Sequence, residues 1–142
     1  MSSRSKSTLA AVLVLASSSL SLAQVSGAKA KDPALQAAIE ARQKAINTRN
    51  AAEWDKYTAA DFVNVSAEGE ILSRESRMKT QTSTPPTPNN NAVIDSVRMF
   101  GADTAVSIQH NASTNNRITI VWVRQGGLWK AASSHTSTIK GK

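Results

Sequence analysis

Three side chains have the chemistry of acid–base catalysis. The imidazole of His135 titrates near neutral pH, so it can exchange a proton with a substrate within hydrogen-bond reach. Tyr57 and Asp61, four residues apart, offer a phenol donor and a carboxylate base. Each also has a structural alternative. His135 can be hydrogen-bonded at the rim of a sheet, while Tyr57 can pack a helix onto that sheet and Asp61 can end the helix.

Five further side chains can contact a bound molecule. Trp122 and Trp129 would dominate any pocket that they face, because only 4% of the chain is aromatic. Phe62 and Asn64 share one face of a predicted strand, and the Asn64 amide can bond to a ligand. His110, in phase with the apolar residues of another strand, could share the same pocket. The alternatives are a core position for the tryptophans and an edge or solvent position for His110.

Other chemistries lack the residues that they need. The chain has no cysteine, which excludes thiol catalysis, disulfide exchange and cysteine-based metal sites. His110, His135 and Asp61 are the residue types of a two-histidine-one-carboxylate site, but no spacing holds them together. There is also no phosphate-binding loop and no Gly-x-Ser-x-Gly sequence. We therefore expect neither a metal nor a cofactor.

The basic excess does not indicate a nucleic-acid partner. The formal net charge is +7, and the basic residues are spread along the chain. No arginine-rich run or aromatic-interleaved motif accompanies them, so we expect no nucleic acid to bind. Weak attraction to anionic surfaces of a cell envelope is the milder consequence.

A β-hairpin over Arg117–His135 is the element that would position the tryptophans and His135. β-Branched and aromatic residues alternate along its first half, and Gly126-Gly127 suits a two-residue type I′ turn. The turn pairs Gln125 with Leu128, Arg124 with Trp129, Trp122 with Ala131 and Ile118 with His135. We therefore expect Arg124 to stack on Trp129.

One face of this hairpin is apolar for most of its length and polar at one end. It carries Ile118, Ile120, Trp122, Trp129, Ala131, Ser133 and His135. Such a face is typical of a sheet that lines a half-wet pocket. It is equally typical of an ordinary core that ends at its rim.

The rest of the chain predicts helices early and strands late. We expect helices at 34–47, 51–58 and 74–81, capped by Asp32, Asn50 and Ser73, and strands at 61–65, 71–72, 92–100 and 104–112. In the first helix Leu35, Ala38, Ile39, Arg42 and Ile46 lie near helical spacing, and the apolar members form a stripe that needs a partner surface. Residues 82–91, rich in Pro and Asn, predict a surface loop. This order indicates an α+β fold with helices over one face of a bent sheet.

The N-terminus predicts an exported protein. Arg4 and Lys6 precede the apolar run Leu9–Ala16, and Ser21-Leu22-Ala23 is a small-x-small cleavage site. We expect residues 1–23 to be a signal peptide, with a second site at Ala28-Lys29-Ala30, and residues 31–140 to be one domain. The apolar run is shorter than the roughly 20 residues that span a bilayer, so we expect no stable membrane insertion. The expected location is periplasmic or secreted.

The arrangement resembles the nuclear transport factor 2-like superfamily, and within it the SnoaL-like group called domain of unknown function 4440. The resemblance rests on the helix Ala34–Asn47, the segment Asn50–Val65, the Ser73-Arg74-Glu75 step and the final stretch Val121–Ser137. It implies a cone-shaped α+β barrel, in which a strongly curved, mostly antiparallel sheet surrounds a pocket closed by N-terminal helices. It also implies a homodimer packed through the sheet.

Three functions are compatible with these observations. The first is an exported domain that binds a small hydrophobic molecule in an apolar pocket. The second is a cofactor-independent isomerase, dehydratase or cyclase that uses His135, or Asp61 with Tyr57. The third is a non-catalytic dimerisation or interaction module whose pocket is filled by side chains. The few titratable groups on the predicted inner face favour binding or packing over catalysis.

Overall fold

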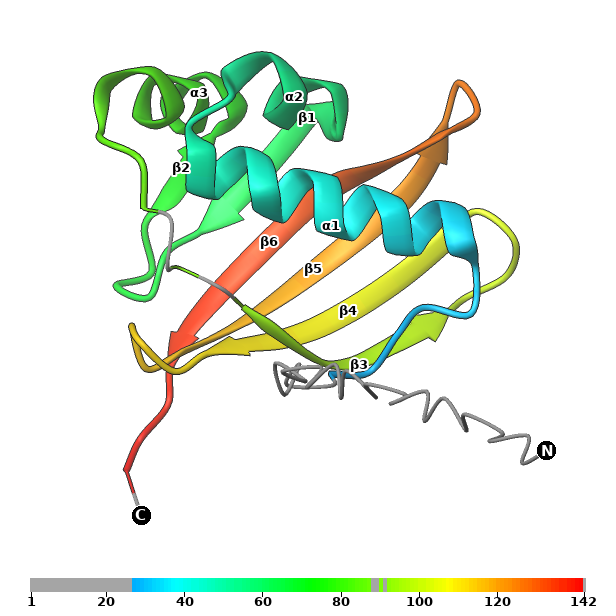
Figure 1. Cartoon of the computed structure of the whole chain (residues 1–142). Coiled ribbons are helices and arrows are strands. Elements are labelled where there is room, and N and C mark those ends of the chain that lie inside the picture. The colour runs from blue at the N-terminus through cyan, green and yellow to red at the C-terminus, as the bar shows by residue number, and fades with distance from the viewer. Residues whose placement is uncertain (1–26, 88–89, 91, 142) are drawn as a thin grey trace, which may run out of the picture.

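The computed structural model describes residues 27–87, 90 and 92–141 (Figure 1). The predicted signal peptide, residues 1–23, lies outside this part of the chain. In chain order the elements are α1 (Pro33–Thr48), α2 (Ala51–Lys56), β1 (Thr58–Val65), β2 (Ile71–Ser73), α3 (Arg74–Ser83), β3 (Val93–Met99), β4 (Thr104–Asn111), β5 (Asn116–Gln125) and β6 (Leu128–Thr138).

Helix α1 begins where the sequence predicts. The Asp32 carboxylate accepts hydrogen bonds from the backbone N–H groups of Ala34 and Leu35, at 2.8 and 3.3 Å. Pro33 is the first helical residue, where its missing N–H costs nothing. The helix ends at Arg49, whose backbone is left-handed with φ 56°. The predicted cap and length are therefore confirmed.

Helix α2 ends earlier than predicted, because Thr58 belongs to a strand. The helix is capped by Asn50 and stops at Lys56. Thr58 pairs with Ala131 of β6, and the Ala131 N–H donates to the Tyr57 carbonyl at 2.9 Å. The local sequence predicts that α2 continues through Thr58. Thr58 is extended instead, because it pairs with a strand more than seventy residues away in the sequence.

Six strands form one open, mixed sheet in the order β2-β1-β6-β5-β4-β3. Strands β1 and β6 are parallel, and the other neighbours are antiparallel. Figure 1 shows α1 lying across one face of the curved sheet, with α2 and α3 beside it over the β1 and β2 end. The α+β class with helices over a curved sheet is confirmed.

The hairpin of β5 and β6 follows the predicted register only near its turn. Arg124 pairs with Trp129 and Trp122 with Ala131, as the two-glycine turn requires. Between Val121 and Trp122 the register shifts by one residue, so Ile118 pairs with Thr136. The prediction that Ile118 faces His135 is therefore wrong. The reason is a β-bulge in β6, which inserts one extra residue into that strand. Every β6 side chain after the bulge therefore points to the opposite face of the sheet from the one predicted.

The core lies between α1 and the concave face of the sheet. Trp54, Trp122 and Trp129 are each only 1% exposed, and Leu35 is fully buried against them. Both indole N–H groups of the hairpin are satisfied: Trp122 donates to Ser107 Oγ at 2.9 Å. Trp129 donates to Asp32 Oδ2 at 3.0 Å, which ties the start of α1 to the hairpin. Among the described residues, no helix combines the length and apolar character needed to cross a membrane.

Candidate ligand-binding pocket

A cavity of about 270 Å³ lies between α1, α3 and the concave face of the sheet. Its apolar surface comes from Ile46, Phe62, Leu72, Ile118 and Ile120. Its polar surface includes Arg42, Asn64, Arg77, Gln109, Ser134 and Thr136. The lining is therefore mixed rather than apolar as we predicted.

Arg42 is a buried cation in the wall of this cavity. Its side chain projects from the inner face of α1, and the residue is only 5% exposed. The guanidinium carbon lies 5.4 Å from the ring centroid of Trp54 and 5.2 Å from that of Phe62. Its Nε donates to Thr58 Oγ1 at 3.3 Å. Burial, and then repulsion from Arg77, lowers the pKa of Arg42 to about 9.

Arg77 brings a second positive charge to the same cavity from α3. It is half-buried, and burial followed by repulsion from Arg49 lowers its pKa. Arg49, at the end of α1, donates from Nε to the Pro85 carbonyl at 2.9 Å. Arg77 is thus repelled by Arg42, which lines the same cavity, and by Arg49, which lies outside the cavity lining.

Neither pocket arginine has a carboxylate partner among the described residues. Elsewhere in the fold arginines are paired: Arg74 with Asp55, and Arg124 with Asp32. Within the described part of the chain, no ion pair involves Arg42 or Arg77. Glu68 contributes the acidic group of the lining, but its side chain is exposed in the turn after β1. The deep part of the cavity is therefore electropositive.

Hydrogen-bonded polar groups form the opposite wall. The Asn64 amide donates to Ser134 Oγ at 2.8 Å and to the Ser134 carbonyl at 3.3 Å, so β1 and β6 are joined at the cavity. Gln109 of β4 is 4% exposed and completes this wall. These neutral groups can donate hydrogen bonds to a ligand or accept hydrogen bonds from it, and they add no charge to the cavity.

Phe62 and Asn64 are the two predicted ligand-contacting residues that line the cavity. Both point inward from β1, as their shared strand face predicts. Trp122 and Trp129 lie in the core instead, where they support the sheet beneath α1. The stacking of Arg124 on Trp129 is confirmed, with the guanidinium carbon 4.7 Å from the ring centroid.

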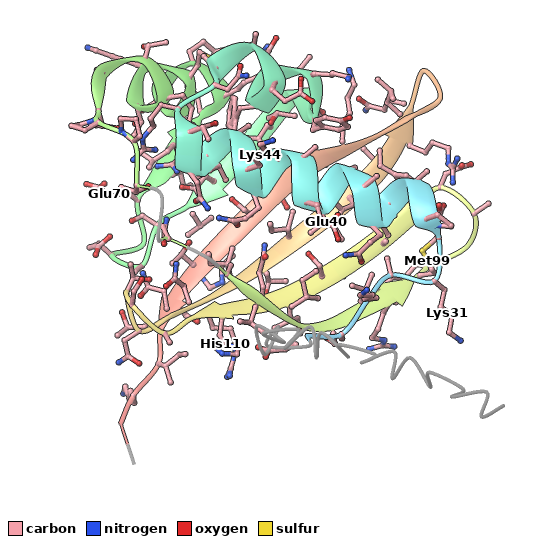
Figure 2. The ribbon with its side chains drawn as sticks, viewed as in Figure 1. Lys31, Glu40, Lys44, Glu70, Met99 and His110 are labelled. Atoms are coloured by element: carbon pink, nitrogen blue, oxygen red, sulfur yellow. The ribbon has the colours of Figure 1, made fainter. Side chains whose placement is uncertain are left out.

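The two histidines lie on the other face of the sheet, which corrects the predicted inward position of His135 and agrees with the solvent alternative for His110. Ser134 and Thr136 line the cavity, so His135 between them points outward, and it is exposed. The bulge in β6 is the reason. Figure 2 shows His110 projecting from the sheet on the side away from α1, where its Nδ1 lies 2.7 Å from Asp95 Oδ1.

Tyr57 and Asp61 are also outside the cavity. Tyr57 packs against the core at the end of α2, with the Lys56 ammonium 4.9 Å from its ring centroid. Asp61 is exposed, because it alternates with the inward-facing Phe62 on β1. His135, Asp61 and Tyr57 therefore do not meet around one cavity. In the described part of the chain, no group of three or more metal-ligating side chains could hold a metal ion.

Comparison with solved structures identifies the fold of this chain. No protein-family model matches the chain. No curated protein matches it either. Among solved structures it is similar to a nuclear transport factor 2-like protein from Cytophaga hutchinsonii, with TM-score 0.63, 17% identity, and 74% of this chain and 95% of that chain covered.

Two further structures extend the comparison. One is a protein of unknown function in the DUF3225 family from Pectobacterium atrosepticum, with TM-score 0.60, 21% identity, and 75% and 89% of the two chains covered. The other is the association domain of C. elegans CaMKII, with TM-score 0.61, 13% identity, and 73% and 92% covered. The chain has the nuclear transport factor 2-like fold. The finer assignment to domain of unknown function 4440 stays a prediction.

Sequence reasoning missed the two arginines that line this cavity. The sequence places Arg42 at helical spacing with the apolar residues of the first helix, and this buried position is the signal that could have identified it. Arg77 carries no such signal, because α3 is polar almost all round and buries mainly Gln81. Only the packing of α3 against β1 brings Arg77 to the cavity.

Proposed function

We propose that this chain is a small-molecule-binding domain that holds its ligand in the cavity beneath α1. The observation that supports the proposal is the buried Arg42 in the wall of that cavity. A charge of this kind costs folding free energy when nothing pairs with it. A core that served packing alone would be more stable with a hydrocarbon side chain there, so the arginine is best explained by a bound partner.

Binding is better supported than acid–base catalysis. The titratable residues of the described lining are Arg42, Arg77 and Glu68. Guanidinium groups remain protonated at neutral pH, and Glu68 is exposed to water. A general base must lie within hydrogen-bond reach of its proton, and His135, Asp61 and Tyr57 lie outside the cavity. The enzyme alternative would need a group that a ligand or a conformational change brings in.

Native mass spectrometry of the protein purified from its own envelope fraction tests the proposal. We expect a non-covalent mass in excess of the chain that disappears when the cavity is filled by Ile118→Trp. Leu128→Trp, at the exposed tip of the hairpin, is the matched control and should keep that mass. An unliganded protein that also binds no added small molecule would refute the proposal.

A second proposal concerns self-association through the outer face of the sheet. Val106, Ile108, Val121 and Val123 point away from α1 on β4 and β5, and Figure 1 shows the helices on the opposite face. These side chains are partly exposed, and no helix of the described residues lies over them. An apolar patch of this kind is typical of an interface. The similar CaMKII structure is called an association domain, which agrees with this proposal. The occupant would be a second copy of the chain.

Sedimentation velocity distinguishes a homodimer from a monomer. Val121→Glu would place buried charges at the centre of the interface, and we expect it to yield monomers. Leu128→Glu introduces the same charge at the exposed hairpin tip and should leave the dimer intact. A wild-type protein that stays monomeric at high micromolar concentration would contradict this proposal.

Export through a cleaved signal peptide remains a proposal as well. It is supported by the basic, apolar and small-x-small segments of residues 1–23. N-terminal sequencing of the protein from periplasm and culture medium tests it. Intact Met1 in the mature protein would contradict export by cleavage.

A further inference from the structure

We infer that the ligand of this cavity is a small organic carboxylate, bound through its anionic end to the guanidinium groups of Arg42 and Arg77. The inference rests on the proposed small-molecule-binding function and names the class of ligand. It is supported by the unpaired charges of the two arginines, by the geometry of the Arg42 guanidinium and by the isoleucine side chains that line the same cavity.

The first support is uncompensated positive charge. Arg42 is almost fully buried, and the one hydrogen bond that the described residues offer its guanidinium is the 3.3 Å contact with Thr58. Arg77 has no carboxylate partner in the described part of the chain, and the two groups repel each other. An anion between them would replace repulsion with charge-assisted hydrogen bonds, which are roughly twice as strong as neutral ones.

The second support is geometric. The planar guanidinium presents paired N–H donors that match the two oxygens of a carboxylate. The Arg42 guanidinium carbon lies over the rings of Trp54 and Phe62, 5.4 and 5.2 Å from their centroids. These two rings meet edge to face at 5.8 Å, so both lie on the same side of the group. The Nε group donates to Thr58, and the two terminal nitrogens make no hydrogen bond with the described residues, so they can donate to a ligand in the cavity. The donor is thus fixed before the ligand arrives.

The third support is the hydrocarbon part of the wall. Ile118 and Ile120 from β5 and Ile46 from α1 line the same cavity as the arginines. An inorganic anion would leave this apolar surface exposed to water, whereas the hydrocarbon part of an organic carboxylate would bury it. The cavity volume of about 270 Å³ lies below the range of about 300–1,000 Å³ for drug-sized ligands, so the organic part must be compact.

Matched pairs of acid and amide test this inference. Benzoate and benzamide have nearly the same shape, as do hexanoate and hexanamide, and each pair differs in charge. Calorimetric titration of the purified protein should show at least one carboxylate binding roughly tenfold or more tightly than its amide. It should also bind more tightly than inorganic phosphate, which has charge but no hydrocarbon part.

Variants assign the binding to the two arginines. We expect Arg77→Gln and Arg42→Met each to weaken carboxylate binding by roughly 10-fold to 100-fold. Lys44→Gln removes one positive charge from the exposed side of α1 and should leave the affinity unchanged. Thermal unfolding of each variant shows that the fold is intact, because a variant that melts as high as the wild type has not lost binding by unfolding.

The outcomes separate this inference from the proposed function. If amides bind as tightly as acids, or if both arginine variants keep the affinity, the ligand is not held by charge and the inference is wrong, while small-molecule binding stands. Phosphate binding more tightly than either carboxylate also overturns it. If no probe binds and the native protein carries no ligand, the proposed function and this inference fail together.

Discussion

At the scale of single residues, Arg42 couples a cost in stability to a capacity for binding. A buried charge without a charged partner is commonly less stable than a hydrocarbon side chain of similar volume. Proteins keep such groups where function requires them. Arg42 packs against the edge-to-face pair of Trp54 and Phe62 and still lines a cavity, which fits this description.

We expect Arg42→Met to raise the melting temperature of the ligand-free protein by roughly 3–6 °C, measured by calorimetry. Arg124→Met should instead lower it, because Arg124 is paired with Asp32. Burial lowers the pKa of Arg42 to about 9 in the folded chain, well below the ordinary value that the unfolded chain retains. The cost of the charge is therefore fully present at neutral pH and falls as pH rises through about 9, so the gain from Arg42→Met should shrink there. A lower melting temperature for Arg42→Met at pH 7 would contradict this account.

Asp32 provides a second residue-scale prediction. Burial raises the pKa of Asp32. Hydrogen bonds from Trp129, Ala34 and Leu35 and the charge of Arg124 lower this pKa by a larger amount, so the net shift is downward. A lowered carboxyl pKa stabilises the fold above the unfolded value of 3.8, and this contribution is lost as pH falls through the folded value. Asp32→Asn keeps a good helix cap and removes the charge.

We expect Asp32→Asn to lower the melting temperature by a few degrees at pH 7 and to make no difference in strong acid. Thermal unfolding between pH 2 and pH 7 checks this. A constant deficit across that range would show that the carboxylate charge has no part in tying α1 to the hairpin.

At the scale of elements, the β5–β6 hairpin depends on its two-glycine turn. Gly126 and Gly127 have φ 57° and 77°, the left-handed values that a type I′ turn requires at both positions. A β-branched residue is strained in this conformation, whereas asparagine adopts it readily.

Gly126→Val should therefore destabilise the protein by about 1–2 kcal/mol. Gly126→Asn should leave the free energy of unfolding nearly unchanged, because Asn-Gly is a favoured type I′ pair. Urea unfolding curves of the two variants provide the measurement. Equal stability of both would mean that the turn does not set the register of the hairpin.

At the scale of the whole molecule, the segment before α1 lies against the β3 edge of the sheet. The Ala28 N–H donates to the Ile94 carbonyl of β3 at 2.7 Å, and the Ala30 N–H donates to the Gln36 side chain at 2.8 Å. A Cβ on Gly27 would lie 2.8 Å from the Ile94 carbonyl oxygen, so this approach requires glycine. Covered edges protect a sheet from pairing with other chains.

Of the two predicted cleavage sites, only the earlier one keeps this segment. A chain that begins at Gln24 should unfold at a higher temperature than one that begins at Lys31, and the shorter chain should aggregate more readily on heating. Differential scanning calorimetry combined with light scattering measures both effects. Identical behaviour would show that the segment contributes nothing to the edge.

The sequence by itself determined the local structure of this protein. Side chains that cap helices act on backbone groups two or three residues away, so Asp32, Asn50 and Ser73 marked the helix starts correctly. Two adjacent glycines defined the hairpin turn, and alternation on β1 placed Phe62 and Asn64 on one face. These signals can be interpreted without the rest of the chain.

Only the tertiary structure decided which side chains meet in the cavity. The bulge in β6 arises where that strand pairs with β5 on one side and β1 on the other, and no local pattern announces it. A single inserted residue put Ser134 and Thr136 inside and His135 outside, because side chains alternate with a period of two. Arg42 and Arg77 come from different helices, so their shared position follows from packing rather than from sequence spacing.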